Sequence, residues 1–340
     1  MTVLNRIGII GTGAWGTALA TACRRAGREV VLRARKADVA DAINKTHENP
    51  AFLPGVALDP AIRATLDEAE AVDADAVLMV MPAQHLRQAG RSLAACWKPG
   101  VPAVICCKGI EQESCALMSE VLAETIPDAP LAVLSGPTFA AEVARDLPTG
   151  VTLAAADPAL AEELSAAIGT PRFRTYQSDD VIGAQMGGAV KNVLAIACGI
   201  VEGRNLGDNT RATLITRGLS EIVHLGQAKG ARMETLMGLS GLGDLILTCN
   251  AMQSRNFSLG VALGEGRSLE DIQGARNSVA EGVFSASSVS ELARRLDVDM
   301  PICLAVDGVL NHFADIDATI KGLLARPFGA ELRAPETRRP

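Results

Sequence analysis

The chain has 340 residues, 48% of them hydrophobic, and a formal net charge of −7. This length favours two domains over one. The basic residues are scattered along an acidic chain, which excludes a nucleic-acid surface.

The cysteines and histidines argue against a disulfide scaffold and a metal site. None of the eight cysteines forms a C-x-x-C pair, and most lie in apolar context, as small buried thiols do. The four histidines lack metal-ligand spacing, so no metal is predicted. The N-terminus does not have the charged-then-apolar build of a secretory signal. These features predict a protein of the reducing cytoplasm.

The chain opens with the pattern of a dinucleotide-binding fold. An apolar strand over residues 6–10 enters a glycine loop, and a predicted helix follows from about residue 14 to 26. The G-x-G-x-x-G spacing is made by Gly11, Gly13 and Gly16. The first glycine allows a tight turn, the second lets the backbone approach a pyrophosphate, and the third packs helix on strand. The alternative is a βαβ turn without a ligand, but strand, loop and helix in this order favour a cofactor site.

The residues after the second strand, 29–33, indicate which dinucleotide is bound. In an NAD site, an acidic residue about 20 residues on accepts the ribose 2′-hydroxyl. Here Arg35 and Lys36 occupy that region, and the first acid is Asp38. The two cations could hold a 2′-phosphate, so NADP is favoured over NAD. The alternative is that both are ordinary solvated surface charges.

The next strands predict a doubly wound parallel sheet with its site along one edge. Each ends in a small polar or glycine-rich turn, and they span residues 76–80, 103–106 and 131–134. Lys108 follows one of these strands, where ligands bind in open α/β sheets. Thr138 follows another and is predicted to cap a helix. A strand, helix and strand continue over residues 149–175, whereas residues 44–56 are predicted to form a loop.

A long helix is predicted from Ser178 to Gly203, with Ser178 as its N-cap. Almost every position after the first turn is apolar or small, as in a helix buried on all sides. The apolar run after Asn192 has only nine residues, against roughly 20 for a membrane span. Glycines in the helix are expected to let another backbone come close, at Gly183, Gly187 and Gly188.

Lys191 lies in the middle of this apolar helix. Burial disfavours a charged amine and lowers its pKa, so Lys191 could act as a general acid or base near neutral pH. The alternative is a packed stem whose amine reaches solvent. No further strand is predicted. We therefore expect a Rossmann-type α/β domain over residues 1–177, an all-α domain over 178–330, and a disordered tail over 331–340.

Two further sites stand out in the helical half. Asp244 follows a glycine-rich turn in an apolar run, and a buried carboxylate needs a partner, for which Lys191 is the obvious candidate. Ser254, Arg255 and Asn256 open a predicted helix whose N-terminus, guanidinium and amide could seat a phosphate. Purely structural roles, as a turn aspartate and a capped helix, are the alternatives.

Taken in order, these segments resemble the bacterial NAD(P)-dependent glycerol-3-phosphate dehydrogenase family over residues 6–325. The motifs that carry the resemblance are GTGAWGTALA, CKGIE, LSGPTFAAEVARDLPTG, GGAVKNVLAIACGI, GDNTRATLITRGL, GLSGLGDLILTC and SRN. The resemblance implies an enzyme that interconverts dihydroxyacetone phosphate and sn-glycerol 3-phosphate with NAD(H) or NADP(H). Its product would supply phospholipid synthesis.

The resemblance also implies roles for individual residues. It makes Lys191 the proton-transferring residue and places Lys108 against both substrate and cofactor. The other expected substrate contacts are Gly136, Thr138, Asp244, Ser254, Arg255 and Asn256. Together with the loop pattern and the basic pair, it gives as expected cofactor contacts Gly11, Gly13, Ala14, Trp15, Gly16, Arg35, Lys36, Ala140, Arg255, Val279 and Glu281.

A few positions depart from the family pattern. Ala14 stands where a serine is common, which removes one hydroxyl near the phosphates. Gln185 replaces a frequent glutamate, and Met252 and Gln253 precede SRN where a proline is frequent. None of these positions touches the expected chemistry.

Two other interpretations stay open. A dehydrogenase of the same build could act on a different hydroxy acid, but it would have no use for the phosphate seat. A dinucleotide sensor without turnover would have no use for a buried Lys191. Apolar helices of the second half could serve a homodimer face, as in the family, although the residues themselves do not report the oligomeric state.

Overall fold

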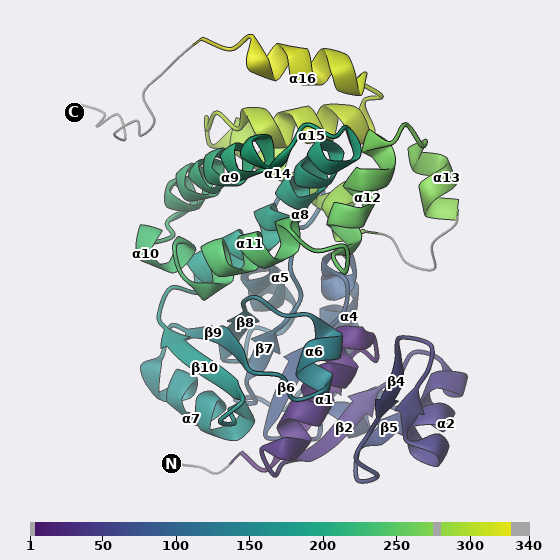
Figure 1. Ribbon diagram of the computed structural model, residues 1–340. Coiled ribbons are helices and arrows are strands. Elements are labelled where there is room, and N and C mark those ends of the chain that lie inside the picture. The colour runs from purple at the N-terminus through teal and green to yellow at the C-terminus, as the bar shows by residue number, and fades with distance from the viewer. Residues whose placement is uncertain (1–3, 275–279, 328–340) are drawn as a thin grey trace, which may run out of the picture.

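The computed structural model describes residues 4–274 and 280–327. A sheet with helices on both faces forms the lower half of Figure 1, and a group of helices lies above it. This arrangement confirms the predicted fold class, an α/β half of Rossmann type followed by a helical half. The expected tail over residues 331–340 and the expected contact Val279 lie outside the described residues.

The main sheet has the strand order β10-β9-β8-β7-β6-β1-β2-β5. Its strands are β1 (Arg6–Ile10), β2 (Glu29–Arg33), β5 (Arg63–Thr65), β6 (Ala76–Met79), β7 (Ala103–Ile105), β8 (Leu131–Ser135), β9 (Thr149–Ala155) and β10 (Phe173–Ser178). The strands from β8 to β5 pair in parallel, but β9 is antiparallel to β8 and parallel to β10. The last two strands therefore differ from the expected all-parallel sheet.

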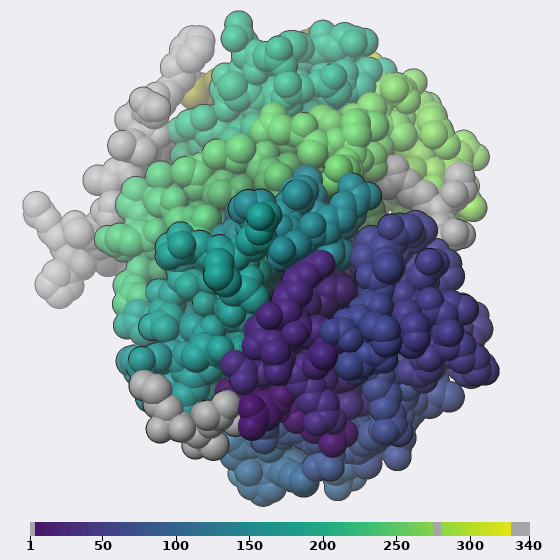
Figure 2. Space-filling model, turned by 60° about the horizontal axis from the view of Figure 1, so that its bottom comes forward, coloured from purple at the N-terminus to yellow at the C-terminus, as the bar shows by residue number. Residues whose placement is uncertain are grey.

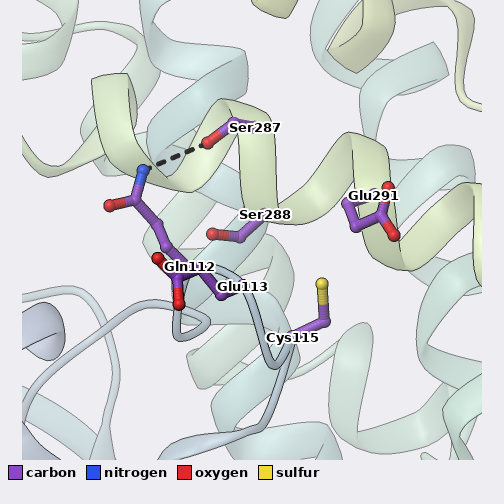
Figure 3. A pocket seen from close by; sticks show the side chains of 6 residues that line it. All are labelled: Gln112, Glu113, Cys115, Ser287, Ser288 and Glu291. Carbon is purple, nitrogen blue, oxygen red and sulfur yellow. Dashed lines mark hydrogen bonds between the residues drawn. The ribbon is translucent and has the colours of Figure 1, made fainter.

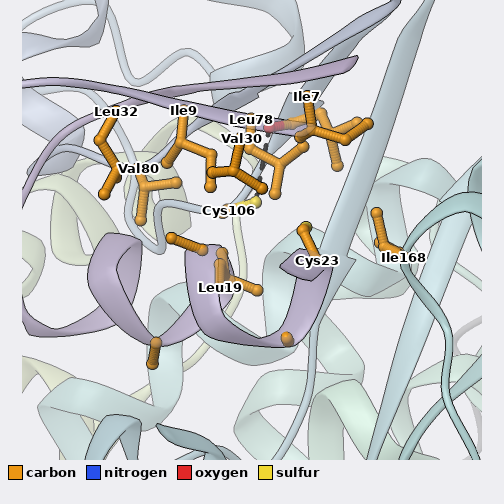
Figure 4. Packing of buried hydrophobic residues seen from close by; sticks show 14 of the residues in the cluster. Ile7, Ile9, Leu19, Cys23, Val30, Leu32, Leu78, Val80, Cys106 and Ile168 are labelled. Atoms are coloured by element: carbon orange, nitrogen blue, oxygen red, sulfur yellow. Dashed lines mark hydrogen bonds between the residues drawn. The ribbon is translucent and has the colours of Figure 1, made fainter. Parts of the chain in front are cut away.

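The helices of this half are α1 (Ala14–Arg25), α2 (Ala37–Thr46), α3 (Glu68–Val72), α4 (Leu86–Leu93), α5 (Met118–Thr125), α6 (Ala140–Ala144) and α7 (Pro158–Ile168), with a 3-10 turn η1 (Ala83–His85). They cover both faces of the sheet, as a parallel sheet requires. In Figure 4, Leu19 and Cys23 of α1 point toward Ile9 and Val30 of the sheet. The opposite face buries Ile10 in a second cluster.

Two local expectations in this half are wrong. Residues 44–56 are not all loop, because β3 (Glu48–Asn49) and β4 (Leu53–Ala57) form a small antiparallel ribbon. The buried amide of Asn49 ties this ribbon to the glycine loop by donating to the Thr12 carbonyl (2.9 Å) and the Thr17 hydroxyl (2.8 Å). Thr138 does not cap α6. Its hydroxyl donates to the Gly136 carbonyl instead, and Phe139 is the N-cap residue.

The long helix, α8 (Val181–Gly203), starts three residues later than predicted. Ser178 ends β10 in the sheet, and the N-cap is Asp180, whose carboxylate accepts a hydrogen bond from the Gly183 N–H (2.8 Å). α8 is long and apolar enough to cross a membrane, but 89% of its apolar window is buried inside the fold. It is therefore a core helix, around which the others pack.

Most of the remaining helices pack around α8, whereas α13 packs on α12 and α16 on α15 (Figure 1). They are α9 (Asp208–Lys229), α10 (Met233–Leu236), a π-helical segment η2 (Leu239–Gly243), α11 (Asp244–Cys249), α12 (Arg255–Gly264), α13 (Leu269–Gly274), α14 (Glu281–Arg295), α15 (Pro301–Asn311) and α16 (Ile316–Leu324). The short helices α11, α13 and α16 were not predicted, because few apolar repeats fit into so few residues. No strand follows Ser178 in the described part of the chain.

Candidate active site

The glycine loop has the geometry of a dinucleotide-binding turn. Gly11 has a φ of +123°, and a Cβ there would lie 2.1 Å from the Val80 carbonyl oxygen. A Cβ on Gly16 would lie 1.9 Å from the Gly11 carbonyl oxygen, so Gly16 lets α1 pack on the loop. Gly13 faces open space at the N-terminus of α1, with no side-chain cap. These residues fit a pyrophosphate, because the turn, the open approach and the helix N-terminus are all present.

The segments beside the loop place the other expected cofactor residues. Ala14 and Trp15, in the first turn of α1, and Ala140, at the start of α6, are partly buried against the same core. Figure 2 shows the first segment of the chain (purple) next to the teal segment that contains α6. Arg25 joins the two helices by donating to the carbonyls of Val143 (2.9 Å) and Ala144 (2.5 Å). These bonds hold α6 against α1.

The basic pair after β2 is open to solvent. Arg35 and Lys36 are both exposed, and within residues 4–274 and 280–327 no ion pair joins either of them to a carboxylate. The neighbouring Arg33 is different, because its guanidinium pairs with Glu68 at 2.7 Å. Two unpaired cations at this edge of the sheet are available to an anionic group.

The centre of the site is a buried carboxylate between two lysines. Asp244 has no solvent exposure, and its two oxygens accept hydrogen bonds from Lys191 Nζ (2.5 Å) and Lys108 Nζ (2.6 Å). The contact between Lys191 and Asp244 that we expected is therefore present. Lys191 also donates to the Thr248 hydroxyl (2.8 Å), and Lys108 to the Gly136 carbonyl (2.9 Å). Four segments far apart in sequence, at Lys108, Gly136, Lys191 and Asp244, thus meet at one point.

Burial dominates the electrostatics of this centre. The Lys191 side chain is 8% exposed, and its burial lowers the pKa to about 8 from 10.5. The nearby Asp244 carboxylate opposes this shift, whereas the charge of Lys108 adds to it. A lysine with such a pKa exchanges a proton near neutral pH. Two ammonium groups against one carboxylate also leave a net positive charge for an anionic substrate.

Glycines in α8 make the close approach possible. A Cβ on Gly187 would lie 2.4 Å from the Ser240 carbonyl oxygen, so η2, which leads into Asp244, packs directly on α8. A Cβ on Gly188 would lie 3.2 Å from Lys108 Cγ, so the stem of Lys108 passes over that glycine. The expected backbone contact is confirmed at Gly187, whereas Gly183 and Gly188 meet side chains.

The expected phosphate segment lies at the start of α12. Ser254 caps this helix by accepting from the Phe257 N–H (3.2 Å), and Arg255 is exposed in its first turn. The buried Asn256 amide donates to Asn192 Oδ1 (2.9 Å) and accepts from the Gly282 N–H (3.0 Å). Asn256 therefore joins α12 to α8 and α14 next to Lys191.

Glu281, the first residue of α14, lies where the two halves meet. The Ala83 backbone of η1 is close enough to this carboxylate to favour its charged form. Burial raises the pKa of Glu281 to about 7, and the guanidinium of Arg255 opposes the shift. The expected cofactor contacts Arg255 and Glu281 are thus neighbours.

Sequence reasoning missed Thr248, which accepts the second hydrogen bond of Lys191. Thr248 is four residues after Asp244 on α11, so the two share one helix face. This spacing was the available signal, but the short helix was not predicted. Within the described residues, no group of three or more histidine, cysteine, aspartate or glutamate side chains could hold a metal ion.

Comparison with known proteins agrees with this geometry. The family model for the N-terminus of NAD-dependent glycerol-3-phosphate dehydrogenase matches residues 6–161, and the model for its C-terminus matches residues 180–321. The chain is 61% identical over 330 residues to glycerol-3-phosphate dehydrogenase [NAD(P)+] of Rhodospirillum rubrum, covering 97% of this chain and 95% of the relative. It is 59% identical over 327 residues to the enzyme of the same name from Parvibaculum lavamentivorans, covering 96% and 98%.

A solved structure shows the same fold over almost its whole length. The crystal structure of glycerol-3-phosphate dehydrogenase from Coxiella burnetii superposes with a TM-score of 0.91 at 36% identity, covering 96% of this chain and 100% of that one. Both halves of the chain and the order of its motifs therefore agree with one family. The chain belongs to the NAD-dependent glycerol-3-phosphate dehydrogenase family.

Proposed function

We propose that the protein reduces dihydroxyacetone phosphate reversibly to sn-glycerol 3-phosphate with NAD(P)H, and that the product supplies glycerophospholipid synthesis. Membership of the family supports the reaction. The observation that carries the proposal is the buried Asp244 held between Lys191 and Lys108, beside the start of α12. A dinucleotide sensor would gain nothing from this costly arrangement.

The roles of the residues follow from their positions. The bound nicotinamide cofactor supplies the hydride. The Lys191 ammonium donates a proton to the C2 carbonyl oxygen of the substrate, and in the reverse direction the neutral amine removes the hydroxyl proton. Lys108 stabilises the negative charge that develops on this oxygen. Asp244 orients both lysines and balances their charge.

The ends of the substrate and cofactor are assigned in the same way. Arg255, Asn256 and the helix N-terminus at Ser254 would hold the substrate phosphate, because charged forks and helix N-termini favour anions. Gly136 and Thr138 would contact the substrate beside Lys108. The glycine loop, with Ala14 and Trp15, would hold the cofactor, and Ala140 and Glu281 would complete its site.

NADP is the proposed preference, because Arg35 and Lys36 are exposed at the end of β2. Replacing both with alanine should raise the KM for NADPH about tenfold or more and change the KM for NADH little, since one charged hydrogen bond contributes about 1.5–3 kcal/mol. Equal changes in the two KM values would contradict the preference.

The whole protein is proposed to be a cytoplasmic homodimer. Residues 1–177 would bind the dinucleotide and residues 178–330 would supply the proton donor and the phosphate seat. The two regions share a core, because Ala184 of α8 is buried in a cluster with the sheet. Sedimentation of the protein at several concentrations would test the dimer, and a monomer throughout would contradict it.

A substrate panel tests the proposed reaction. NADPH oxidation should occur with dihydroxyacetone phosphate and fall strongly with unphosphorylated dihydroxyacetone or with 2-keto acids. The Arg255→Ala variant should lose most of its preference for the phosphorylated ketone. Turnover of a 2-keto acid alone would indicate another dehydrogenase, whereas NADPH binding without any turnover would indicate a sensor.

A further inference from the structure

Lys108 stands at the start of a loop that is closed on itself. Residues 107–117, which we call the Lys108 loop, connect β7 to α5. A bridge joins Ile110 to Leu117, and the Glu111 N–H donates to the Ala116 carbonyl (3.0 Å). Glu113 and Cys115 have φ angles of 64° and 59°, which non-glycine residues rarely adopt. Such a backbone persists only where its surroundings fix it.

The side chain of Gln84 holds one side of this loop by bonding to backbone groups of the loop. From η1, its Nε2 donates to the Ile110 carbonyl (2.9 Å), and its Oε1 accepts from the Gln112 N–H (2.9 Å). Gly109, next to Lys108, packs on the same turn, because a Cβ there would lie 2.6 Å from the Ala83 Cβ. The residues that follow Lys108 are therefore held directly against η1.

Arg87 holds the loop by binding the side chain of Glu111. Its Nε and Nη2 donate to the two oxygens of Glu111, each at 2.8 Å, and its Nη1 donates to Glu124 of α5 (2.5 Å). The Glu111 side chain is only 13% exposed, and the hydrogen bonds from Arg87 lower the pKa of its carboxyl. A two-pronged contact of this kind fixes direction as well as distance.

The other side of the loop faces α14 across a hollow of about 290 Å³ (Figure 3). Gln112 Nε2 reaches across it to the Ser287 hydroxyl at 3.3 Å. Arg295 donates to the carbonyls of Ser114 and Glu113, but its side chain is 44% exposed. This side borders on solvent, whereas the hydrogen bonds of Gln84 to Ile110 and of Arg87 to Glu111 are partly buried.

We propose that Gln84 and Arg87 are positioning residues that hold the Lys108 loop so that Lys108 reaches Asp244 and the Gly136 carbonyl. This inference rests on the proposed function, in which Lys108 stabilises the charge on the substrate oxygen. Within residues 4–274 and 280–327, no hydrogen bond or ion pair joins either residue to Asp244 or Lys191. Their effect on turnover must therefore pass through Lys108.

A double-mutant cycle tests this route. Gln84→Ala and Arg87→Ala should each lower kcat for dihydroxyacetone phosphate about 10–100-fold, because a displacement of about 1 Å can cost about a hundredfold. In a Lys108→Ala background, the same changes should lower kcat less than about twofold, since the group they position is absent. The Arg87→Lys variant keeps the charge but loses the two-pronged contact. Its kcat should therefore lie between those of wild type and Arg87→Ala.

The matched control is Arg24→Ala. Arg24 is 24% exposed, against 23% for Arg87, and it also has two partners, Asp59 and the Arg28 carbonyl, but it lies at the end of α1 away from the site. This variant should leave kcat unchanged. Equal losses with and without Lys108, or no loss in either background, would overturn the proposal.

A second measurement does not depend on turnover. Amide hydrogen exchange of residues 109–112 should be at least about tenfold faster in Gln84→Ala and Arg87→Ala than in wild type and Arg24→Ala. If wild type does not turn over dihydroxyacetone phosphate, the proposed function fails, and this exchange still decides whether the two residues hold the loop. Unchanged exchange in both variants would show that they do not.

Discussion

At the scale of single residues, the site depends on a charge that burial makes costly. A buried carboxylate needs partners, and Asp244 has two lysines and no exposure. Lys191 in turn has two acceptors, Asp244 and Thr248, which fix its amine. The lysine is thus oriented as well as desolvated, and both effects would serve the proposed proton transfer.

The pKa of Lys191 predicts opposite pH profiles in the two directions. Reduction needs the protonated amine, so kcat/KM should fall as the pH rises through about 8. Oxidation needs the neutral amine, so kcat/KM should rise over the same range. Asp244→Asn removes the carboxylate that opposes burial, while Lys108 and Cys249 remain nearby, so the midpoint should move to lower pH. A reduction rate that stays flat from about pH 6 to about pH 10 would exclude Lys191 as the donor.

At the scale of the elements, α8 and α12 pack backbone on backbone. A Cβ on Gly260 of α12 would lie 2.1 Å from the Ile196 carbonyl oxygen of α8, and one on Gly199 would lie 2.1 Å from the Phe257 carbonyl oxygen. This contact sets the distance between Lys191 and the proposed phosphate segment at the start of α12. We therefore expect these glycines to matter to function as well as to stability.

Gly260→Ala should destabilise the protein by about 3 kcal/mol, the upper range for overpacking, because backbone atoms have to move. Gly322→Ala is the matched control, since Gly322 lies in α16 with open space around the position of its Cβ. This control should be neutral or stabilise the helix by about 0.5–1 kcal/mol. Urea unfolding measures both changes. Equal stabilities of the two variants would contradict the tight packing.

A second contact between elements predicts how stability depends on pH. The buried Glu221 of α9 caps α15 by accepting from the N–H groups of Ile302 (2.7 Å) and Cys303 (3.1 Å). Burial raises its pKa to about 7 from 4.5, and Asp299 adds to the shift. The folded state therefore favours the protonated acid. The contribution of this shifted pKa of Glu221 to the stability of the fold is complete below about pH 4.5. It is lost as the pH rises through about 7.

The measurement is the free energy of unfolding of wild type and Glu221→Gln at about pH 5 and about pH 8. The difference between the two free energies of unfolding should change by up to about 3 kcal/mol between these pH values. The glutamine variant should be relatively more stable at the higher pH. Glu281 shifts in the same direction but is present in both proteins, so it cancels. A difference that does not change with pH would contradict the account.

At the scale of the whole molecule, the site is assembled from both halves. Lys108 and Gly136 come from the ends of β7 and β8, whereas Lys191 and Asp244 come from α8 and α11. A relative movement of the halves would separate Lys108 from Asp244. Contacts across this seam, such as the hydrogen bond of Lys108 to Asp244, therefore hold the proposed catalytic residues together.

Much of the fold and of the candidate site could be predicted from the sequence, because these features depend on local sequence patterns. The glycine spacing marked the cofactor turn, and an all-round apolar helix marked a buried Lys191. The burial of Asp244 predicted its partner. The contact between Lys108 and Asp244 could not be predicted from pattern alone, since 136 residues separate them. Nor could the contacts of Gln84 and Arg87, which depend on how η1 and α4 lie against a loop.

The antiparallel direction of β9 is a second feature that could not be predicted from the sequence. A parallel return from β8 needs a crossover long enough to carry the chain back along the sheet. The only helix on that connection is α6, with five residues, and at about 1.5 Å per residue it is too short for the return. The chain therefore re-enters the sheet from the edge where β8 ends. The apolar pattern of the strand carries no sign of its direction.

The most direct test of the account is NADPH oxidation with dihydroxyacetone phosphate by wild type and Lys191→Ala, with NADPH binding measured in both. We expect turnover by wild type and a loss of about 10²–10⁴-fold in the variant, the usual contribution of a general acid, with NADPH binding retained. Turnover that survives the substitution would contradict the central role of Lys191. Lys108 or a water molecule would then be the proton donor.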